Sequence, residues 1–136
     1  MKKWIAIWVF LFLVIGNQLL ANDTTQPKTR TTITGTASYY SKKFEGRKTA
    51  TGERFHHKNL TGASNNFKLN TWVKVTNIKT GAFVVVRIND RMHRNMKKKG
   101  RVIDLTRSAA AKIGILSKGL AKVRVELAEK PSQTSN

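Results

Sequence analysis

The sequence contains no cysteine among its 136 residues. This absence excludes a disulfide framework and a thiolate nucleophile, and we expect no lipid anchor attached to a cysteine. Because no covalent cross-link is available, we expect a packed core to stabilise the protein.

Acidic residues are also scarce: 7 Asp and Glu stand against 26 Lys and Arg, which gives a formal net charge of +19. We therefore expect a polyanionic partner. Nucleic acid is one polyanion, but no helix-turn-helix, zinc-finger or ribonucleoprotein-type motif is present, and the export signal described next argues against it. Cell-wall glycan with its carboxylates and anionic lipid head groups remain. The three lysines at 97–99 are interpreted as a solvated loop.

Only one long apolar run occurs, at residues 4–15, directly after Lys2 and Lys3. Twelve residues fall short of the roughly 20 that cross a bilayer, whereas this layout, ending near Ala21, is typical of a cleavable signal peptide. We predict a signal peptide at 1–21 and export to the periplasm or cell envelope, with no membrane span or lipid anchor afterwards. Loss of the two lysines leaves a charge of 19 − 2 = +17.

The histidines show no metal-ligand spacing, and no glycine-rich loop that could cradle a phosphate is present. We therefore predict no metal site and no cofactor. Polar, aperiodic segments at 22–32 and 129–136 are interpreted as a flexible linker and a flexible tail. Residues 33–128 are enough for one small domain, expected to be a monomer.

Apolar and polar residues alternate at 121–127 and at 71–78, and a short Gly-containing connection joins the second segment to an apolar run at 82–88. These patterns predict strands, the last two as a hairpin. Further strands are expected at 33–40 and 101–105. A helix is expected at about 108–115, with Thr106 or Ser108 as its N-cap. Many short strands in so small a domain favour a mainly β, closed barrel with one or two short helices. Its predicted buried residues are Val73, Val75, Val85, Ile103, Val123 and Val125.

The domain has only five acidic residues against 21 basic ones, so candidates for acid or base chemistry are few. Glu126 alternates outward on its strand, and Glu45 lies in a basic loop. Asp104 fits helix capping or barrel structure about as well as catalysis. Asp90 follows the apolar run at 82–88, where an Asn-Asp pair is as typical of a turn as of a site. Glu53 is the remaining candidate.

Four segments together resemble one family: 35–55 (GTASYYSKKFEGRKTATGERF), 60–64 (LTGAS), 73–91 (VKVTNIKTGAFVVVRINDR) and 101–115 (RVIDLTRSAAAKIGI). They occur in the order and spacing of the RlpA family of septal-ring-associated lytic transglycosylases. The resemblance implies a six-stranded double-psi β-barrel, related to barwin and expansin domains. It also implies a periplasmic enzyme that cleaves peptidoglycan glycan strands without hydrolysis and prefers strands stripped of stem peptides.

The resemblance also assigns site residues. The family's catalytic Glu and Asp correspond to Glu53 and Asp90, both in intact motifs. Asp90 is then the general acid and base, because a lytic transglycosylase uses the substrate's own C6 hydroxyl as nucleophile and one carboxyl can serve both steps. Ser64 stands where the family usually has a His, and we expect it to contact substrate or shape the site's charge. The family's lipid-bearing cysteine and C-terminal SPOR repeat are not seen here, so a soluble protein of the barrel alone is implied.

Three further residues are candidates for contact with substrate. Tyr39 and Tyr40 could stack on sugar rings, although tyrosines in strands are often part of the core. Arg91 would favour the ionised form of Asp90, which works against an acid role if its side chain points into the groove.

Two other readings remain open. A non-catalytic, expansin-like module that binds peptidoglycan is favoured by the replacement of the family's His by Ser64. A cationic protein acting on membranes or lipopolysaccharide would need an amphipathic basic helix, and the helix at 108–115 is too short and too alanine-rich for that role.

Overall fold

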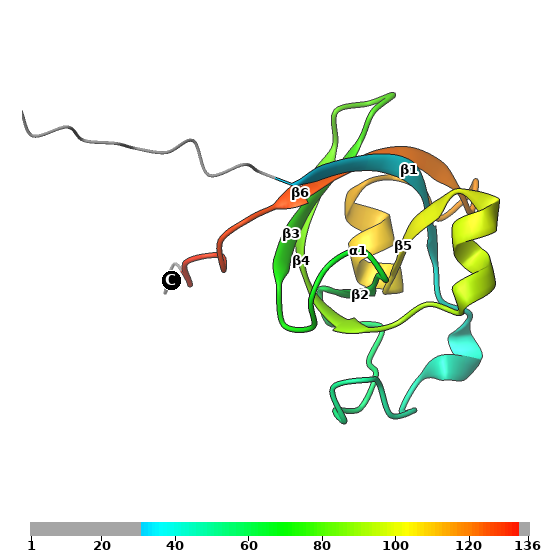
Figure 1. Cartoon of the computed structure of the whole chain (residues 1–136), viewed down its shortest axis with the longest axis vertical. Helices are drawn as coiled ribbons and strands as arrows, with labels where there is room; N and C mark the ends of the chain where they lie inside the picture. Colours follow the sequence, from blue (N-terminus) through cyan, green and yellow to red (C-terminus); the bar gives the residue numbers. More distant parts are fainter. Residues whose placement is uncertain (1–30, 134–136) are drawn as a thin grey trace, which may run out of the picture.

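The computed structural model describes residues 31–133, and they form one closed barrel (Figure 1). The six strands follow one another around the barrel in the order β1-β5-β2-β4-β3-β6. Their bounds are β1 (Thr32–Tyr39), β2 (Thr61–Ala63), β3 (Trp72–Asn77), β4 (Phe83–Asp90), β5 (Arg101–Leu105) and β6 (Ala121–Leu127). β1 pairs with β5, and β2 with β4, in parallel, whereas the other pairs are antiparallel. The predicted six-stranded barrel is confirmed.

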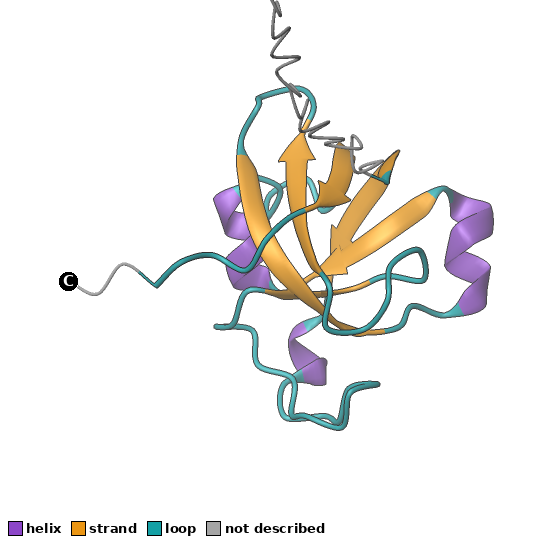
Figure 2. Cartoon of the chain, turned by 60° about the vertical axis from the view of Figure 1, so that its left-hand side comes forward, coloured by secondary structure: helices purple, strands orange, loops and turns teal. Residues whose placement is uncertain are grey.

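Short helices lie in the connections between strands (Figure 2). α1 (Arg107–Lys112) follows β5, and its N-cap is Thr106, whose hydroxyl accepts a hydrogen bond from the Ala109 N–H at 3.3 Å. The two 3-10 helices are η1 (Lys42–Phe44) and η2 (Arg94–Lys99). The helix is shorter than predicted because Gly114, in the left-handed region at φ +72°, turns the chain after Ile113. Within residues 31–133, no helix is long and apolar enough to cross a membrane.

The core lies inside the barrel and consists mostly of β-branched residues, which suit the pleated surface of strands. Val73, Val75, Ile103, Val123 and Val125 are buried as predicted. The prediction for Val85 was wrong: its neighbours Val84 and Val86 point into the core, and Val85 lies half-exposed on the outer face. Three consecutive valines hide the phase of the alternation, and only the pairing of the strand fixes it.

Two predictions on strands need correction. β4 does not end before Asn89 but continues through Asp90, and β2, a strand of three residues, was not foreseen. The predicted signal peptide at 1–21 lies outside the described residues, as do 22–30 of the predicted linker at 22–32 and 134–136 of the predicted tail. The last linker residue, Thr32, is the first residue of β1.

Candidate functional site

A β-bulge turns Asp90 toward the outside of the barrel. β2 pairs with β4 at Thr61↔Arg87 and Gly62↔Ile88, but the next pair is Ala63↔Asp90, so Asn89 is an extra residue. Simple alternation would place Asp90 on the inner face with Ile88, whereas one extra residue reverses the face of everything that follows. The carboxylate is therefore on the same outer face as Arg87, and it is partly exposed.

Three donors hold the Asp90 carboxylate. Oδ1 accepts hydrogen bonds from the backbone N–H groups of Ala50 and Arg91, both at 2.9 Å, and Oδ2 accepts from the Tyr40 hydroxyl at 2.7 Å. The Ala50 contact joins the loop at 46–55 to the end of β4, and the Thr51 N–H strengthens it by donating to the Asn89 carbonyl at 3.2 Å. The carboxylate is thus fixed in orientation by two segments distant in sequence.

Tyr40 packs its ring among other aromatic side chains. Its centroid lies 4.5 Å from that of Phe55 and 5.3 Å from that of Phe44. Burial, followed by the hydrogen bond and the charge of Asp90, raises the pKa of Tyr40 well above its usual range. The hydroxyl therefore stays protonated and available to Asp90, while the role in sugar stacking expected for Tyr40 stays a prediction.

A second carboxylate, that of Asp104 on β5, faces the same outer side of the barrel as Asp90. Ala63 pairs with Asp90 of β4 and with Asp104 of β5, so the two aspartates flank one alanine. Two strand spacings separate their backbones by about 10 Å. Asp104 accepts a hydrogen bond from the Ser38 hydroxyl, and its charge also contributes to the raised pKa of Tyr40. Sequence reasoning left Asp104 open; the pairing places it beside the candidate site.

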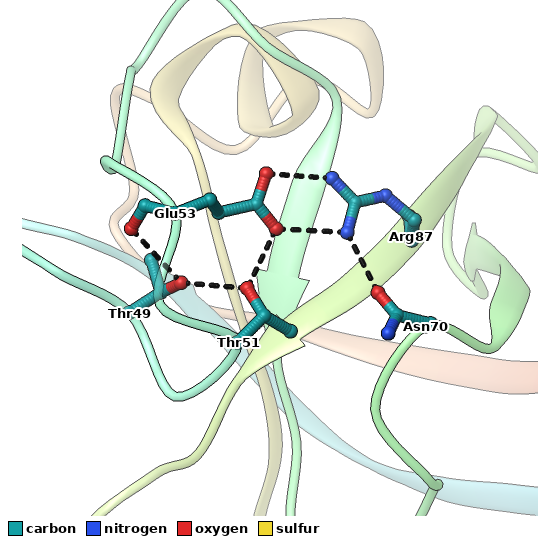
Figure 3. Close-up of polar contacts among 5 residues, drawn as sticks. All are labelled: Thr49, Thr51, Glu53, Asn70 and Arg87. Carbon is teal, nitrogen blue, oxygen red and sulfur yellow. Dashed lines mark hydrogen bonds and ion pairs between the residues drawn. The ribbon is translucent and has the colours of Figure 1, made fainter.

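Glu53 makes a bidentate ion pair with Arg87 (Figure 3). Its Oε1 and Oε2 accept from the two terminal guanidinium nitrogens at 2.8 Å each, and Oε1 also accepts from the Thr51 hydroxyl at 2.7 Å. Arg87 donates in addition to the Asn70 side chain at 2.9 Å. The hydrogen bonds from Arg87 are the main cause that lowers the pKa of Glu53 to about 2. Glu53 is thus ionised at neutral pH and suited to positioning rather than to donating a proton.

The Arg91 side chain points away from the Asp90 carboxylate. One terminal nitrogen donates to the carbonyl oxygens of Ser64 and Phe67, the second at 2.6 Å, so the guanidinium holds the loop after β2. Ser64 exposes none of its surface, and its hydroxyl donates to the Val102 carbonyl at 2.8 Å. The substrate contacts expected of these two side chains stay predictions, and they would require rearrangement of this loop.

Tyr39 belongs to a different neighbourhood. Its hydroxyl donates to the Leu116 carbonyl at 2.6 Å, and the Arg107 guanidinium lies 5.0 Å from its ring centroid. Adjacent residues of a strand face opposite sides, so Tyr39 is directed toward α1 and the segment after it. The structure therefore brings Tyr40 to Asp90, and Glu53 close by through its loop. It does not bring Tyr39 there.

No group of three or more His, Asp and Glu side chains able to hold a metal ion occurs in residues 31–133.

The arrangement of Asp90, Tyr40 and the Glu53-Arg87 pair allows proton transfer. The Asp90 carboxylate lies on an exposed face, is assisted by a protonated tyrosine and is flanked by an ionised Glu-Arg pair.

Comparison with known proteins identifies a family. The sequence profile of a family described as lytic transglycolase matches residues 32–125. The chain is 48% identical over 93 residues to the endolytic peptidoglycan transglycosylase RlpA of Pasteurella multocida, and 45% identical over 92 residues to that of Haemophilus influenzae. Each match covers 68% of this chain and 31% of the relative. The chain thus spans about a third of the length of these curated relatives.

Two solved structures share the fold at low identity. The Streptomyces papain inhibitor gives a TM-score of 0.58 at 21% identity, covering 73% of this chain and 96% of the inhibitor. An expansin of Clavibacter michiganensis gives 0.57 at 21% identity, covering 75% of this chain and 52% of the expansin. At this identity the likeness supports the double-psi barrel fold alone.

Proposed function

Because the chain belongs to the RlpA family of lytic transglycosylases, we propose that it cleaves the glycosidic bond between N-acetylmuramic acid and N-acetylglucosamine in peptidoglycan strands. It acts within the strand and leaves 1,6-anhydro ends. The observation that carries this proposal is Asp90, turned outward by the bulge and held by Tyr40 and the Ala50 and Arg91 N–H groups. We place its action outside the cytoplasm, on strands poor in stem peptides.

One proton cycles through Asp90. The protonated carboxyl gives its proton to the bridging oxygen, the bond from that oxygen to C1 of the muramic acid breaks, and an oxocarbenium-like centre develops. The C6 hydroxyl of the same sugar then attacks C1 and returns its proton to the Asp90 carboxylate. No water is consumed. The Tyr40 hydroxyl suits both steps, because it can donate to the ionised carboxylate and accept from the protonated one.

Glu53 and Asp104 supply negative charge around this reaction. Glu53 is ionised and fixed by Arg87, and the backbone of Asp104 lies about 10 Å from that of Asp90, two strand spacings away. Both can stabilise positive charge that develops at C1, and neither is needed as a nucleophile because the substrate supplies its own hydroxyl.

A non-catalytic module that binds glycan is the second candidate. The observation in its favour is Ser64, which replaces the family's His and is buried with its hydroxyl bonded to Val102. A module of this kind would keep the charged residues and the ability to bind glycan, while the cleavage reaction is lost.

Mass spectrometry of purified peptidoglycan strands after incubation with the protein separates these functions. Anhydro-ended fragments support the lytic transglycosylase, and fragments with reducing ends contradict it in favour of a hydrolase. Intact strands that nevertheless sediment with the protein support the binding module. The same strands incubated with Asp90→Asn protein serve as the matched control.

A further inference from the structure

A groove on the outer face of the barrel lies next to the Glu53-Arg87 pair. Its volume is about 310 Å³. One wall comes from the segment that precedes β2 and from β2 itself, the floor from Trp72 of β3 and Val85 of β4, and the other wall from residues 130–133, which follow β6. The Ala128 N–H donates to the Trp72 carbonyl at 2.9 Å, and this bond brings the segment after β6 alongside β3.

The floor of the groove is apolar and carries the domain's tryptophan. The sequence has three tryptophans, Trp4, Trp8 and Trp72, and the first two fall within the predicted signal peptide. Trp72 pairs with Arg87 across β3 and β4, and the half-exposed Val85 is the next outward residue of β4. An aromatic ring on an apolar floor is the surface on which a ligand with one apolar face packs best.

The rim is polar, and its charges are positive. Asn59 and Thr61 contribute an amide and a hydroxyl, and Arg87 and the exposed Lys130 contribute cations, while no carboxylate is among the lining residues. Arg87 already pairs with Glu53, so Lys130 is the cation on this rim best placed to meet an anionic ligand. An acidic ligand with hydrogen-bonding groups suits this rim.

The groove and Asp90 lie on one continuous face. Arg87 and Asp90 both face outward on β4, three residues apart, which corresponds to about 10 Å along a strand. A chain-like ligand whose scissile bond lies at Asp90 would therefore cross Arg87 and reach Trp72.

From these observations we propose that the groove binds one N-acetylmuramic acid residue of the glycan strand, at a distance from the bond that is cleaved. The inference rests on the proposed function for the identity of the strand. Trp72 stacks on the apolar face of the sugar ring, Asn59 and Thr61 bond its polar substituents, and Lys130 pairs with the lactyl carboxylate. The volume lies at the lower end of ligand pockets, which span about 300–1,000 Å³, and therefore suits a single substituted sugar ring.

Binding of purified, peptide-free glycan strands tests the proposal. In the full chain carrying Trp4→Phe and Trp8→Phe, Trp72 is the sole tryptophan. We expect a saturable change in its fluorescence on addition of strands. We also expect Trp72→Ala to raise the dissociation constant about tenfold, the size typical of a buried aromatic anchor, and Trp72→Phe to restore most of the affinity. A fluorescence signal that strands leave unchanged, or a Trp72→Ala protein that binds as wild type, overturns the proposal.

Phe83→Ala is the matched control. Phe83 is an aromatic residue on the outer face of the neighbouring strand β4, 55% exposed, but it does not line the groove. Its loss should change the dissociation constant by less than about twofold, as expected of surface substitutions. Thermal unfolding of each variant verifies that the barrel is intact.

Lys130→Gln tests the acidic character of the ligand. We expect it to weaken binding of glycan strands several-fold and to leave binding of chitin oligosaccharides, which lack the lactyl carboxylate, unchanged. Equal binding of strands by Lys130→Gln and wild type contradicts a muramic acid ligand. Anhydro-ended products, measured separately, show whether the protein cleaves the strands. Failure of the groove to bind muramic acid is thus distinguished from failure of the proposed reaction.

Discussion

At the scale of single residues, Asp90 and Glu53 differ in what holds them. Asp90 receives hydrogen bonds from a neutral hydroxyl and two backbone N–H groups, whereas Glu53 is paired with a guanidinium. Arg87 therefore keeps Glu53 ionised. We therefore keep acid and base chemistry at Asp90 and a positioning role for Glu53 as parts of the proposed function.

Asp90→Asn should abolish cleavage and leave the fold and glycan binding intact. The Asn oxygen can still accept from the Ala50 and Arg91 N–H groups, and its NH₂ can donate to a rotated Tyr40 hydroxyl, so only the transferable proton is lost. General acid catalysis contributes on the order of 10² to 10⁴ in rate. The measurement is the yield of anhydro-ended fragments, with thermal unfolding as the control. Cleavage at the wild-type rate would leave Asp90 as a structural residue of the bulge.

Glu53→Gln should remove a component of stability that depends on pH. The pKa of Glu53 is about 2 in the folded protein and 4.5 for the unperturbed group. Because the folded value is the lower one, the ion pair stabilises the fold fully above pH 4.5 and loses this effect as the pH falls toward 2. The difference in melting temperature between wild type and Glu53→Gln should be constant near neutral pH and vanish at the acidic end.

Glu126→Gln is the control for this pH series. Its ion pair with Arg124 is long, at 4.0 Å, and Arg124 is exposed, so little stability is expected from it. A Glu53→Gln protein that melts like wild type at every pH would show that the pair with Arg87 does not stabilise the fold.

At the scale of elements, close contact between strands sets the shape of the site. β1 lies very close to its neighbour β5 at Gly35. A Cβ added there would meet the Val102 side chain and lie 2.9 Å from the Gly100 carbonyl oxygen. The same two strands carry Ser38 and Asp104, which pair with each other three residues after Gly35 and two residues after Val102. Only a glycine allows this approach, so the position of Asp104 beside the site depends on Gly35.

Gly35→Ala should destabilise the barrel by about 1–3 kcal/mol, the usual cost of overpacking. The backbone carbonyl of Gly100 cannot move aside as a flexible side chain could. The measurement is the free energy of unfolding in urea. Thr34→Ala, at the neighbouring exposed position of the same strand, should cost less than about 1 kcal/mol. Equal values for the two variants would contradict close packing of β1 on β5.

At the scale of the whole molecule, the excess of positive charge governs the approach to its partner. The domain has 21 basic and five acidic residues, and two of the five, Glu53 and Glu45, are engaged with Arg87 and His56. A cationic protein accumulates at an anionic polymer before any specific contact forms. We therefore expect the charge to act on recruitment to the wall, and the groove and Asp90 to act on the individual strand.

Association with purified peptidoglycan should weaken steeply as salt rises, because screening shortens the range of attraction from about 30 Å at 0.01 M to 3 Å at 1 M. We expect the association rate to fall at least tenfold between these limits. Stopped-flow mixing with labelled glycan strands measures the rate. Chitin oligosaccharides, which carry no charge, provide the control, and a rate on glycan strands that does not change with salt contradicts recruitment by charge.

The sequence alone determined the barrel class and most of its strands. β5 and β6 lie at the predicted residues, and in β6 the alternation is regular and one face is buried. Thr106, the cap of α1, was one of the two caps predicted, because a hydroxyl residue before three alanines is a local signal. The family motifs singled out Asp90 and Glu53 without any coordinates.

Only the tertiary structure decided which way these side chains point. The extra residue Asn89, visible only in the pairing with β2, turns Asp90 outward, and the pairing of Ala63 brings Asp104 beside it. The direction of the Arg91 side chain likewise depends on two carbonyl groups of a distant loop. Such contacts join residues many positions apart, and no local pattern of hydrophobicity records them. Local periodicity therefore determines the strands, and the register between strands determines the site.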